Sequence, residues 1–241
     1  LPSAESPSGI IWKPWAIRKP MTFFADWQRI RTLPKRISRS YTGCFTFLKW
    51  FENLERLYPG VPVAMLHTPY QEDGKITQDQ LDYMVKQLKE DVIPKMELVS
   101  GKKFDLERLS KMMENSAKAE DLLVKVLESA KNVPTPIDAY FAGVYYIGPI
   151  FTAFRGTEAA VEYYTELWNE VQERMRLGLG PITPEGEIKE QKFRVVVEGP
   201  PNWTNFREFW KIFYDMGAVI VASSYTKVGG VYDLGFRHDS K

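Results

Sequence analysis

The sequence has very little cysteine or histidine: one cysteine and two histidines occur in 241 residues. A single cysteine excludes an internal disulfide framework and is typical of a reducing compartment, so we expect a cytoplasmic protein. The two histidines, His67 and His238, are far apart and show no zinc-ligand spacing. The sequence therefore indicates neither a disulfide scaffold nor a zinc site.

Several other patterns are also missing. No apolar run approaches the ~20 residues that span a bilayer, so we expect no membrane association. No P-loop, nucleophile elbow or kinase signature is present, and the glycines near the C-terminal end do not form a G-x-G-x-x-G fingerprint. The composition instead indicates a globular protein, because 44% hydrophobic and 14% aromatic residues can build one large or two small domains.

The first 40 residues differ in charge from the rest of the chain. They contain eight Lys or Arg against two acidic residues, a charge of +6, which leaves −5 for the other 201 residues given the net charge of +1. Such a basic segment could bind nucleic acid or act as a transit peptide. No groove-binding motif is present, and four prolines interrupt any amphipathic helix: Pro7, Pro14, Pro20 and Pro34. We therefore expect no nucleic-acid partner and a leader that contributes little to the core.

Hydrophobic spacing predicts alternating helices and strands after the leader. Val61–His67 is a short apolar run of strand type. A capping box of Thr77 and Gln80 opens one helix, and Pro94 bends or ends it. The expected helices cover residues 45–58, 77–99, 105–131 and 157–177. The third of these helices carries an apolar stripe, which we interpret as a packing surface: Leu106, Leu109, Met113, Ala117, Leu122, Val126 and Leu127.

The last part of the chain predicts a β-α-β unit with parallel strands. Residues 193–198 and 218–222 have strand character, and residues 206–216 form a helix opened by a capping box of Asn205 and Glu208. Both strands then end in loops at the same sheet edge, where ligands bind in open parallel sheets. These loops provide one candidate site, with Gly199, Trp203 and Tyr225.

We therefore expect an α/β fold made of partial Rossmann-like lobes, whose parallel strands are joined by a helical region. The segment before Cys44 is basic where a buried strand should be apolar, so the first sheet should be defective or very small. A polar, proline-containing segment at 178–191 is the best domain boundary. The expected parts are a leader (1–40), a remnant of a first α/β lobe (41–76), a helical region (77–190) and the start of a second α/β lobe (191–241).

Cys44 stands where an extended segment gives way to a helix, directly after Tyr41, Thr42 and Gly43. The free N–H groups of a first helical turn stabilise a thiolate, so a cysteine at this position suits a nucleophile or a metal ligand. We expect it to react faster with a thiol reagent than a buried cysteine does. A lone cysteine is also among the most buried residue types and behaves as a small hydrophobe. Local chemistry leaves both interpretations open.

Long segments rich in aromatic residues and glycine cover roughly four fifths of the chain. They are YTGCFTFLKWFE (41–52), PYQEDGKIT (69–77), NSAKAEDLLVKVLESAKN (115–132), PIDAYFAGVYYIGPIFTAFRGT (136–157), VVVEGPPNWTNFREFW (195–210) and VASSYTKVGG (221–230). Through these segments the chain resembles the cluster-bearing subunits of ATP-dependent benzoyl-CoA reductase, in the superfamily of the 2-hydroxyacyl-CoA dehydratases. The residues before Cys44 are more similar to the reductases than to the dehydratases.

The resemblance implies an oxidoreductase of anaerobic aromatic degradation, which reduces the ring of benzoyl-CoA to a cyclic diene. It implies a [4Fe-4S] cluster with Cys44 as one ligand, a CoA thioester substrate, ferredoxin as electron donor, and other reductase subunits that include an ATP-hydrolysing activator. His67 could donate a proton or a hydrogen bond to the substrate, or it could be structural. The expected surroundings of the substrate or cluster are Tyr41, Thr42, Gly43, His67, Gly199, Trp203 and Tyr225.

The chain departs from the family pattern in its cysteines and at its ends. Family members spread their cluster cysteines along the subunit, whereas this chain has only Cys44, and a cluster usually needs four thiolates. Residues 1–40 do not resemble the family, and the sequence stops at Lys241 where relatives continue. We therefore expect a fragment, a truncated or mispredicted gene product or a deliberately shortened chain, inactive on its own. A dehydratase subunit and a non-catalytic scaffold subunit are the alternatives.

Overall fold

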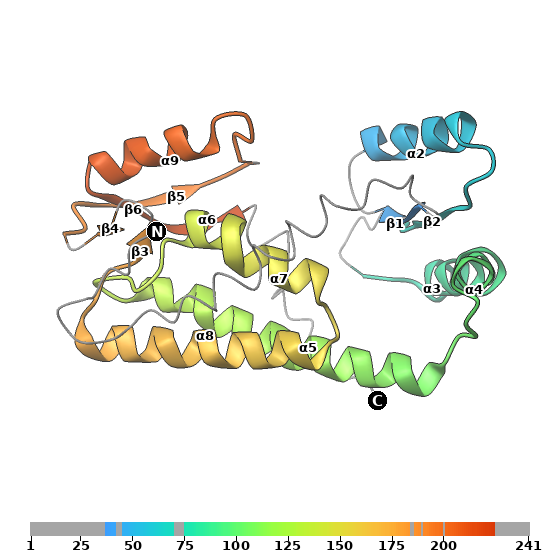
Figure 1. Cartoon of the computed structure of the whole chain (residues 1–241), viewed down its shortest axis with the longest axis horizontal. Helices are drawn as coiled ribbons and strands as arrows, with labels where there is room; N and C mark the ends of the chain where they lie inside the picture. The colour runs from blue at the N-terminus through green and yellow to red at the C-terminus, as the bar shows by residue number, and fades with distance from the viewer. Residues whose placement is uncertain are drawn as a thin grey trace. The chain divides into compact units, whose positions relative to one another are not determined.

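The structure is a computed structural model that describes residues 37–41, 45–69, 75–183, 186–188, 190–199 and 201–224. The chain divides into two compact units between Leu106 and Glu107. We call the described residues up to 106 the N-terminal unit and those from 107 the C-terminal unit. Each unit contains a pair of parallel strands connected through a helix (Figure 1), which confirms the α/β fold class. The lobe limits at residues 76 and 190 stay a prediction.

The N-terminal unit begins with a β-α-β arrangement. Strand β1 (Ile37–Tyr41) pairs in parallel with β2 (Val63–His67), and helix α2 (Phe45–Leu57) connects them. Within this unit, α2 lies on one face of the strand pair and the helices after β2 lie on the other (Figure 1). Val63 and Ala64 of β2 are buried there. In the part of the chain that the structure describes, the first sheet is as small as the sequence predicts.

Strand β1 overlaps the end of the predicted leader. Residues 37–40 belong to the leader in the sequence analysis, and they pair in register with Val63–Leu66. A short strand of a two-stranded sheet does not need the continuous apolar run of a central parallel strand, so basic residues are tolerated here. The leader before residue 37, with its prolines and tryptophans, lies outside the described residues.

Two deletions of different length should show which part of the leader contributes to the fold. Deleting residues 1–31 should leave the melting temperature nearly unchanged, because prolines and unbalanced basic charge disfavour packing there. Deleting residues 1–41 removes β1, so the amides of Ala64 and Leu66 lose their strand partner and should exchange faster with deuterium. Hydrogen exchange followed by mass spectrometry measures the second effect, and thermal unfolding measures the first. A large drop in melting temperature for the shorter deletion would show that the whole leader belongs to the fold.

The helical segment after β2 is interrupted where the sequence places a proline. Helix α3 (Gln78–Gln87) continues through a π-helical turn η1 (Leu88–Val92) into α4 (Ile93–Ser100). Pro94 lies in the first turn of α4, where its missing N–H removes one bond of the regular helical ladder. The capping box is confirmed, since the N–H of Gln80 donates to Thr77 and the N–H of Thr77 donates to Gln80. The predicted bend at the proline takes the form of this π turn.

The C-terminal unit contains a helical core followed by short strands. Its elements are α5 (Leu106–Glu128), η2 (Ser129–Lys131), α6 (Ala139–Ala142), η3 (Gly143–Ile147), α7 (Gly148–Ala153), α8 (Glu158–Leu177), β3 (Ile182–Thr183), β4 (Gly186–Glu187), β5 (Phe193–Val197), α9 (Phe206–Asp215) and β6 (Ala218–Ser223). Helix α8 begins after the N-cap Thr157 and ends at Gly178, which adopts a left-handed conformation with φ +65°, as the sequence predicts.

Helices α5 and α8 lie side by side and run in the same direction (Figure 1). Near their N-terminal ends the side-chain amide of Asn115 donates to the carbonyl of Gly156 at 3.3 Å, and near their C-terminal ends Asn132 contacts the sulfur of Met175. Buried apolar residues from both helices and from the segment that connects them form the core between them: Ala119, Leu123, Val126, Ala130, Ile137, Ala142, Ile147, Ile150, Ala160, Tyr164 and Val171.

The predicted apolar stripe of α5 is buried only in its later turns. Leu109 and Met113, in the first turns, are 38% and 57% exposed, so the interpretation of the whole stripe as packing surface is wrong. Within the described residues, the reason is that α8 begins beside Met112 and Asn115 of α5 and does not extend along the preceding turns of α5.

The C-terminal β-α-β unit is confirmed. Strands β5 and β6 pair in parallel, with α9 between them in the chain and a register shift at Val195 and Val196. Trp210 of α9 and Val219 of β6 are fully buried. On β5, by contrast, Val196 is 69% exposed.

The predicted capping box of Asn205 and Glu208 is wrong. Asn205 is the N-cap residue of α9, but its side chain accepts no hydrogen bond from the helix. Its backbone angles, φ −137° and ψ 41°, differ from the extended conformation that directs an N-cap side chain toward the first turn. The hydroxyl of Thr204 donates instead to the side-chain oxygen of Asn202 at 2.9 Å.

Residues 178–191, predicted as a polar linker, contact the helical core. They contain the antiparallel pair β3 and β4. The guanidinium of Arg174 donates to the carbonyl of Gly180 at 2.6 Å, and the side chain of Gln191 exchanges hydrogen bonds with both backbone groups of Thr135, at 2.9 and 3.0 Å. The sequence did not reveal these contacts, because they connect residues up to 56 positions apart.

Within the residues that the structure describes, none of the helices combines the length and the apolar character needed to cross a lipid bilayer.

Candidate functional site

The first candidate site lies at the carboxyl edge of β1 and β2. The parallel register makes Tyr41 and His67 Cα partners, so the last residues of the two strands lie side by side. Ligands of open parallel sheets bind outside this edge. The register therefore brings two of the predicted site residues together, although the side chain of Tyr41 is not described.

Cys44 directly precedes Phe45, the first residue of helix α2. Thr42, Gly43 and Cys44 themselves lie outside the described residues, so their predicted roles stay predictions.

The backbone of His67 is held by a side chain from helix α3. The N–H of His67 donates to the side-chain oxygen of Gln87 at 3.0 Å, and the side-chain amide of Gln87 donates back to the carbonyl of His67, also at 3.0 Å. Gln87 thus binds the strand end as a neighbouring strand does. At the other end of β2, the ammonium of Lys95 donates to the carbonyl of Val63 at 2.9 Å. The outer edge of β2 is therefore occupied by side chains at both ends.

The imidazole of His67 contacts Tyr83. The Nδ1 atom lies 3.2 Å from the hydroxyl oxygen of Tyr83, and the two rings meet edge to face with 5.8 Å between their centroids. Tyr83 and Gln87 are four residues apart on α3, so they lie on one face of that helix. Sequence reasoning missed both residues, because nothing in their spacing indicates a site until β2 is placed beside α3.

The second candidate site lies at the carboxyl edge of β5 and β6. Gly199 follows β5, has φ +98°, and donates its N–H to the hydroxyl of Ser224 at 3.1 Å, so the two strand ends are connected. Trp203, in the same connection between β5 and α9, is 60% exposed and stacks on the ring of Phe206 with 6.4 Å between centroids. Tyr225 lies outside the described residues. Gly199 and Trp203 thus lie at the edge where the sequence predicts them.

Asp138 is a buried carboxylate that sequence reasoning did not identify. One of its oxygens accepts from the N–H groups of Tyr140 and Phe141 at 3.1 and 2.8 Å, at the start of α6. The other oxygen accepts from the N–H of Ile220 in β6 at 3.0 Å. Burial raises the pKa of Asp138, and these N–H bonds lower it in part. The residue connects α6 to β6, and its position directly before a helical run is a typical N-cap signature.

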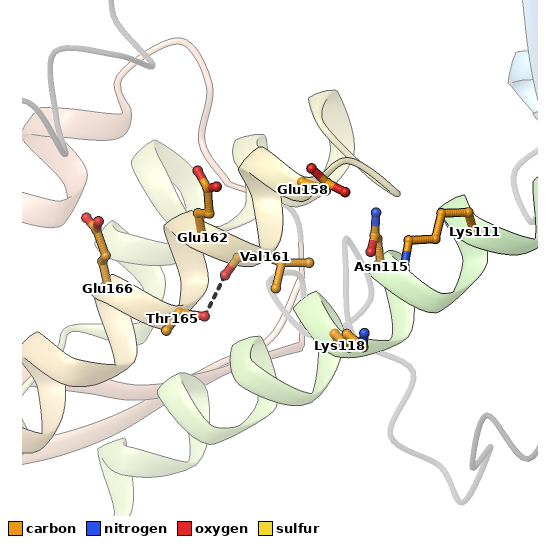
Figure 2. Close-up of a pocket in the computed structure, with 8 residues that line it drawn as sticks. All are labelled: Lys111, Asn115, Lys118, Glu158, Val161, Glu162, Thr165 and Glu166. Carbon is orange, nitrogen blue, oxygen red and sulfur yellow. Dashed lines mark hydrogen bonds between the residues drawn. The ribbon is translucent and has the colours of Figure 1, made fainter. Parts of the chain in front are cut away.

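A groove of about 450 Å³ lies between α5 and α8 (Figure 2). Residues of both helices line it, with lysines on α5 and carboxylates on α8: Lys111, Asn115, Lys118, Glu158, Val161, Glu162, Thr165 and Glu166. Figure 2 shows the hydroxyl of Thr165 turned back to the carbonyl of Val161, 2.7 Å away on the same helix. Exposed charges of opposite sign contribute little binding energy in water. The groove is therefore a weaker candidate than the two sheet edges.

The residues of this chain do not fit a complete iron–sulfur cluster. Such clusters are usually held by four thiolates, and the chain contains one cysteine. Over the described ranges, no group of three or more His, Cys, Asp or Glu side chains is placed to hold a metal ion. Cys44 can supply one ligand at most.

Comparison with known proteins identifies relatives among CoA-thioester enzymes. Residues 32–234 match the family model described as 2-hydroxyglutaryl-CoA dehydratase, D-component. The match begins before Tyr41, which corrects the expectation that residues 1–40 bear no resemblance to the family. A benzoyl-CoA reductase subunit of Thauera aromatica is 68% identical over 206 residues, which are 86% of this chain and 48% of that protein.

More distant relatives are named as dehydratase subunits. The (R)-2-hydroxyisocaproyl-CoA dehydratase alpha subunit of Clostridioides difficile is 27% identical, over 76% of this chain and 43% of its own length. The alpha subunit of (R)-2-hydroxyglutaryl-CoA dehydratase from Acidaminococcus fermentans is 27% identical, over 78% of this chain and 37% of its own length. The chain thus spans less than half the length of these relatives. By the match over residues 32–234, the chain belongs to the 2-hydroxyglutaryl-CoA dehydratase D-component family.

Proposed function

We propose that the chain is part of a benzoyl-CoA reductase subunit. The observation that carries this proposal is the 68% identity to the reductase subunit of Thauera aromatica, against 27% for the two dehydratase subunits. The proposed reaction adds two electrons and two protons to the aromatic ring of benzoyl-CoA and yields a cyclic diene. We place the enzyme in the cytoplasm, because the single cysteine suits a reducing compartment.

The proposed reaction needs partners that this chain does not supply. Electrons at low potential come from ferredoxin, and a separate ATP-hydrolysing activator subunit raises their driving force. We propose a [4Fe-4S] cluster as the electron carrier in the assembled enzyme, with Cys44 as one ligand. The remaining ligands must come from outside this chain, because it contains one cysteine.

The two sheet edges have different proposed roles. We place the cluster near the β1 and β2 edge, with Tyr41, Thr42, Gly43 and His67 around it. We place part of the CoA thioester at the β5 and β6 edge. There the exposed ring of Trp203 can stack on a planar group, with Gly199 and Tyr225 beside it. We also propose that residues 41–76 and 191–241 belong to two α/β lobes joined by the helical region 77–190.

Two other functions are supported by separate observations. A 2-hydroxyacyl-CoA dehydratase subunit is supported by the family model and by the dehydratase relatives. A non-catalytic scaffold subunit is supported by the cysteine count, since one thiolate cannot hold a cluster alone. The dehydratase function differs from our proposal in its substrate. The scaffold function differs from it because it does not require Cys44.

A hybrid enzyme tests the proposal. The matching 206 residues of the Thauera aromatica subunit are replaced by those of this chain, and the complex is assembled with its partner subunits under anaerobic conditions. We expect ATP-dependent loss of benzoyl-CoA and no dehydration of (R)-2-hydroxyacyl-CoA thioesters. Cys44→Ser should abolish the activity. Unchanged activity of Cys44→Ser would support the scaffold function, and dehydration of hydroxyacyl thioesters would support the dehydratase.

The isolated chain should hold no stable cluster. Three thiolates are missing from the usual four, and a carboxylate or imidazole is a poor replacement for a soft ligand at iron. After anaerobic incubation with iron and sulfide, desalted protein should retain little iron and give no cluster signal in electron paramagnetic resonance. Cys44→Ala is the matched control and should behave in the same way. About four irons per chain that are lost in the Cys44→Ala variant would contradict this expectation.

A further inference from the structure

Three exposed glutamates of α8 form one wall of the groove between α5 and α8. Glu158, Glu162 and Glu166 are four residues apart, so each lies about 6 Å from the next along the helix axis. Carboxylates at this spacing repel each other and destabilise a helix. Among the residues that the structure describes, none of the three has an ion pair or a hydrogen bond from its side chain. Within this chain, nothing compensates the repulsion along the row.

Glutamates farther along the same helix do have partners. Glu170 accepts a hydrogen bond from Arg174 at 3.0 Å, and Glu173 accepts from Arg176 at 2.6 Å. In the groove wall, by contrast, the residue four positions after each glutamate is another glutamate. The unpaired carboxylates of α8 are thus concentrated where the helix borders the groove.

Lysines of α5 form the opposite wall (Figure 2). Lys111 and Lys118 are seven residues apart, which places them two turns apart on one face of the helix. Lys111 contacts Glu114 of its own helix at 3.4 Å, and Lys118 has no ion pair in the described part of the chain. Neither lysine therefore neutralises the glutamates across the groove. The two walls present opposite charges to whatever lies between them.

Asn115 adds a hydrogen-bond acceptor to the lining of the groove. Its side chain is largely buried, since the residue is only 7% exposed, and its amide donates to the carbonyl of Gly156 at 3.3 Å. Because a carbonyl can only accept, the amide nitrogen faces Gly156 and the side-chain oxygen faces away from it. Within the described ranges this oxygen accepts no hydrogen bond. Such an acceptor favours a donor group that enters from outside the chain.

We propose that the groove binds a helix of another subunit, with basic side chains on the edge that faces α8 and acidic side chains on the edge that faces α5. The proposal rests on the proposed function for the identity of the partner. Residues four apart on a helix match the spacing of the glutamates, and residues seven apart match the spacing of the lysines. Charges that flank a contact between helices determine partner and orientation. They contribute more to specificity and association rate than to affinity, so a groove that binds small ligands weakly can still select a helix.

Glu162→Lys tests the proposal, because it should change folding and docking in opposite directions. The new lysine lies between Glu158 and Glu166 and replaces two repulsive pairs by two attractive ones, so the full chain should unfold at a higher temperature. In the hybrid enzyme the same lysine would face basic side chains. We expect the dissociation constant between the hybrid subunit and its partner subunits to rise on the order of 10-fold at low salt. Thermal unfolding and mass photometry measure the two effects.

A charge-matched control and a reversal of the other wall complete the test. Glu55→Lys changes the net charge equally at an exposed residue of α2 that has no ion pair among the described residues, and it should leave assembly unchanged. Lys118→Glu should weaken assembly as Glu162→Lys does, and high salt should reduce both effects. If Lys118→Glu strengthens assembly instead, the partner is simply cationic and the proposal of a helix with two charged edges is wrong.

Other results would also overturn the proposal. If Glu162→Lys and Lys118→Glu both leave the dissociation constant unchanged, the groove is not a docking surface. If Glu162→Lys lowers the melting temperature of the hybrid subunit alone, the rest of that subunit occupies the groove. Dimers of the native chain that Glu162→Lys dissociates would place a second copy there. A native hybrid subunit that does not assemble with its partner subunits would contradict the proposed function instead.

Discussion

Gly156→Ala should destabilise the C-terminal unit by about 3 kcal/mol. Gly156 has φ +78°, where an alanine costs roughly 1–2 kcal/mol. A Cβ atom at this position would lie 2.9 Å from the carbonyl oxygen of Met112 and 3.0 Å from its Cβ atom, so α8 would have to move away from α5. Overpacking of this kind typically costs about 1–3 kcal/mol. Urea unfolding followed by circular dichroism measures the change.

Gly178→Ala is the matched control for this substitution. Gly178 has a similar backbone angle, φ +65°, but a Cβ atom there meets nothing within 4 Å. The control therefore carries only the conformational cost, about 1 kcal/mol. If the two variants lose the same stability, the close approach of α5 and the start of α8 is not a packing constraint, and our description of this junction is wrong.

Asp138→Ala should also cost about 3 kcal/mol. The substitution leaves the N–H groups of Tyr140, Phe141 and Ile220 without their acceptor. A buried donor that loses its partner costs about 1–3 kcal/mol, and the removal of a buried carboxylate offsets part of the sum. Thermal and urea unfolding measure the loss. Faster amide exchange at Ile220 than at Val219 would show that the lost hydrogen bond to strand β6 contributes to this loss of stability.

The pH dependence of the free energy of unfolding should reveal the protonation of the Asp138 carboxyl group. Burial raises the pKa of Asp138, so its protonated form fits the folded chain better than the charged form does. The stability contributed by this group is fully present below the unfolded pKa of ~3.9 and is lost as pH rises through the raised folded pKa. Relative to the non-titrating variant Asp138→Asn, the native chain should therefore lose stability as the pH rises from below ~3.9 through the raised folded pKa. A difference that is constant with pH would contradict the raised pKa.

Local signals in the sequence predicted much of the fold. The capping box of Thr77 and Gln80, the stop of α8 at Gly178 and the C-terminal β-α-β unit all depend on residues close together in the chain. The wrong predictions concern features that depend on the three-dimensional arrangement of the chain. Leu109 and Met113 have the helical spacing of buried residues, but the start of α8 limits how much of α5 is covered. Asn205 has the right type for a cap, but its backbone turns the side chain away.

The candidate site was predictable only where strand ends define it. Parallel pairing alone places Tyr41 beside His67, because strands joined by a crossover helix end at the same edge. Gln87 and Tyr83 could not be found in this way, since His67 lies 20 and 16 residues away in the chain, and the bond between Asp138 and Ile220 spans 82 residues. Such long-range hydrogen bonds leave no periodic pattern in the sequence.

The side-chain bonds along β2 determine how other chains can add to these sheets. With Gln87 and Lys95 on its backbone, β2 offers no free run of peptide groups to an incoming strand. Strand β5 is different, since Val196 on it is 69% exposed and β6 is its partner among the described strands. Exposed apolar edge strands promote intermolecular pairing. Self-association of this polypeptide at high concentration should therefore begin at β5, and a lysine in place of Val196 is the change that would keep concentrated samples monomeric.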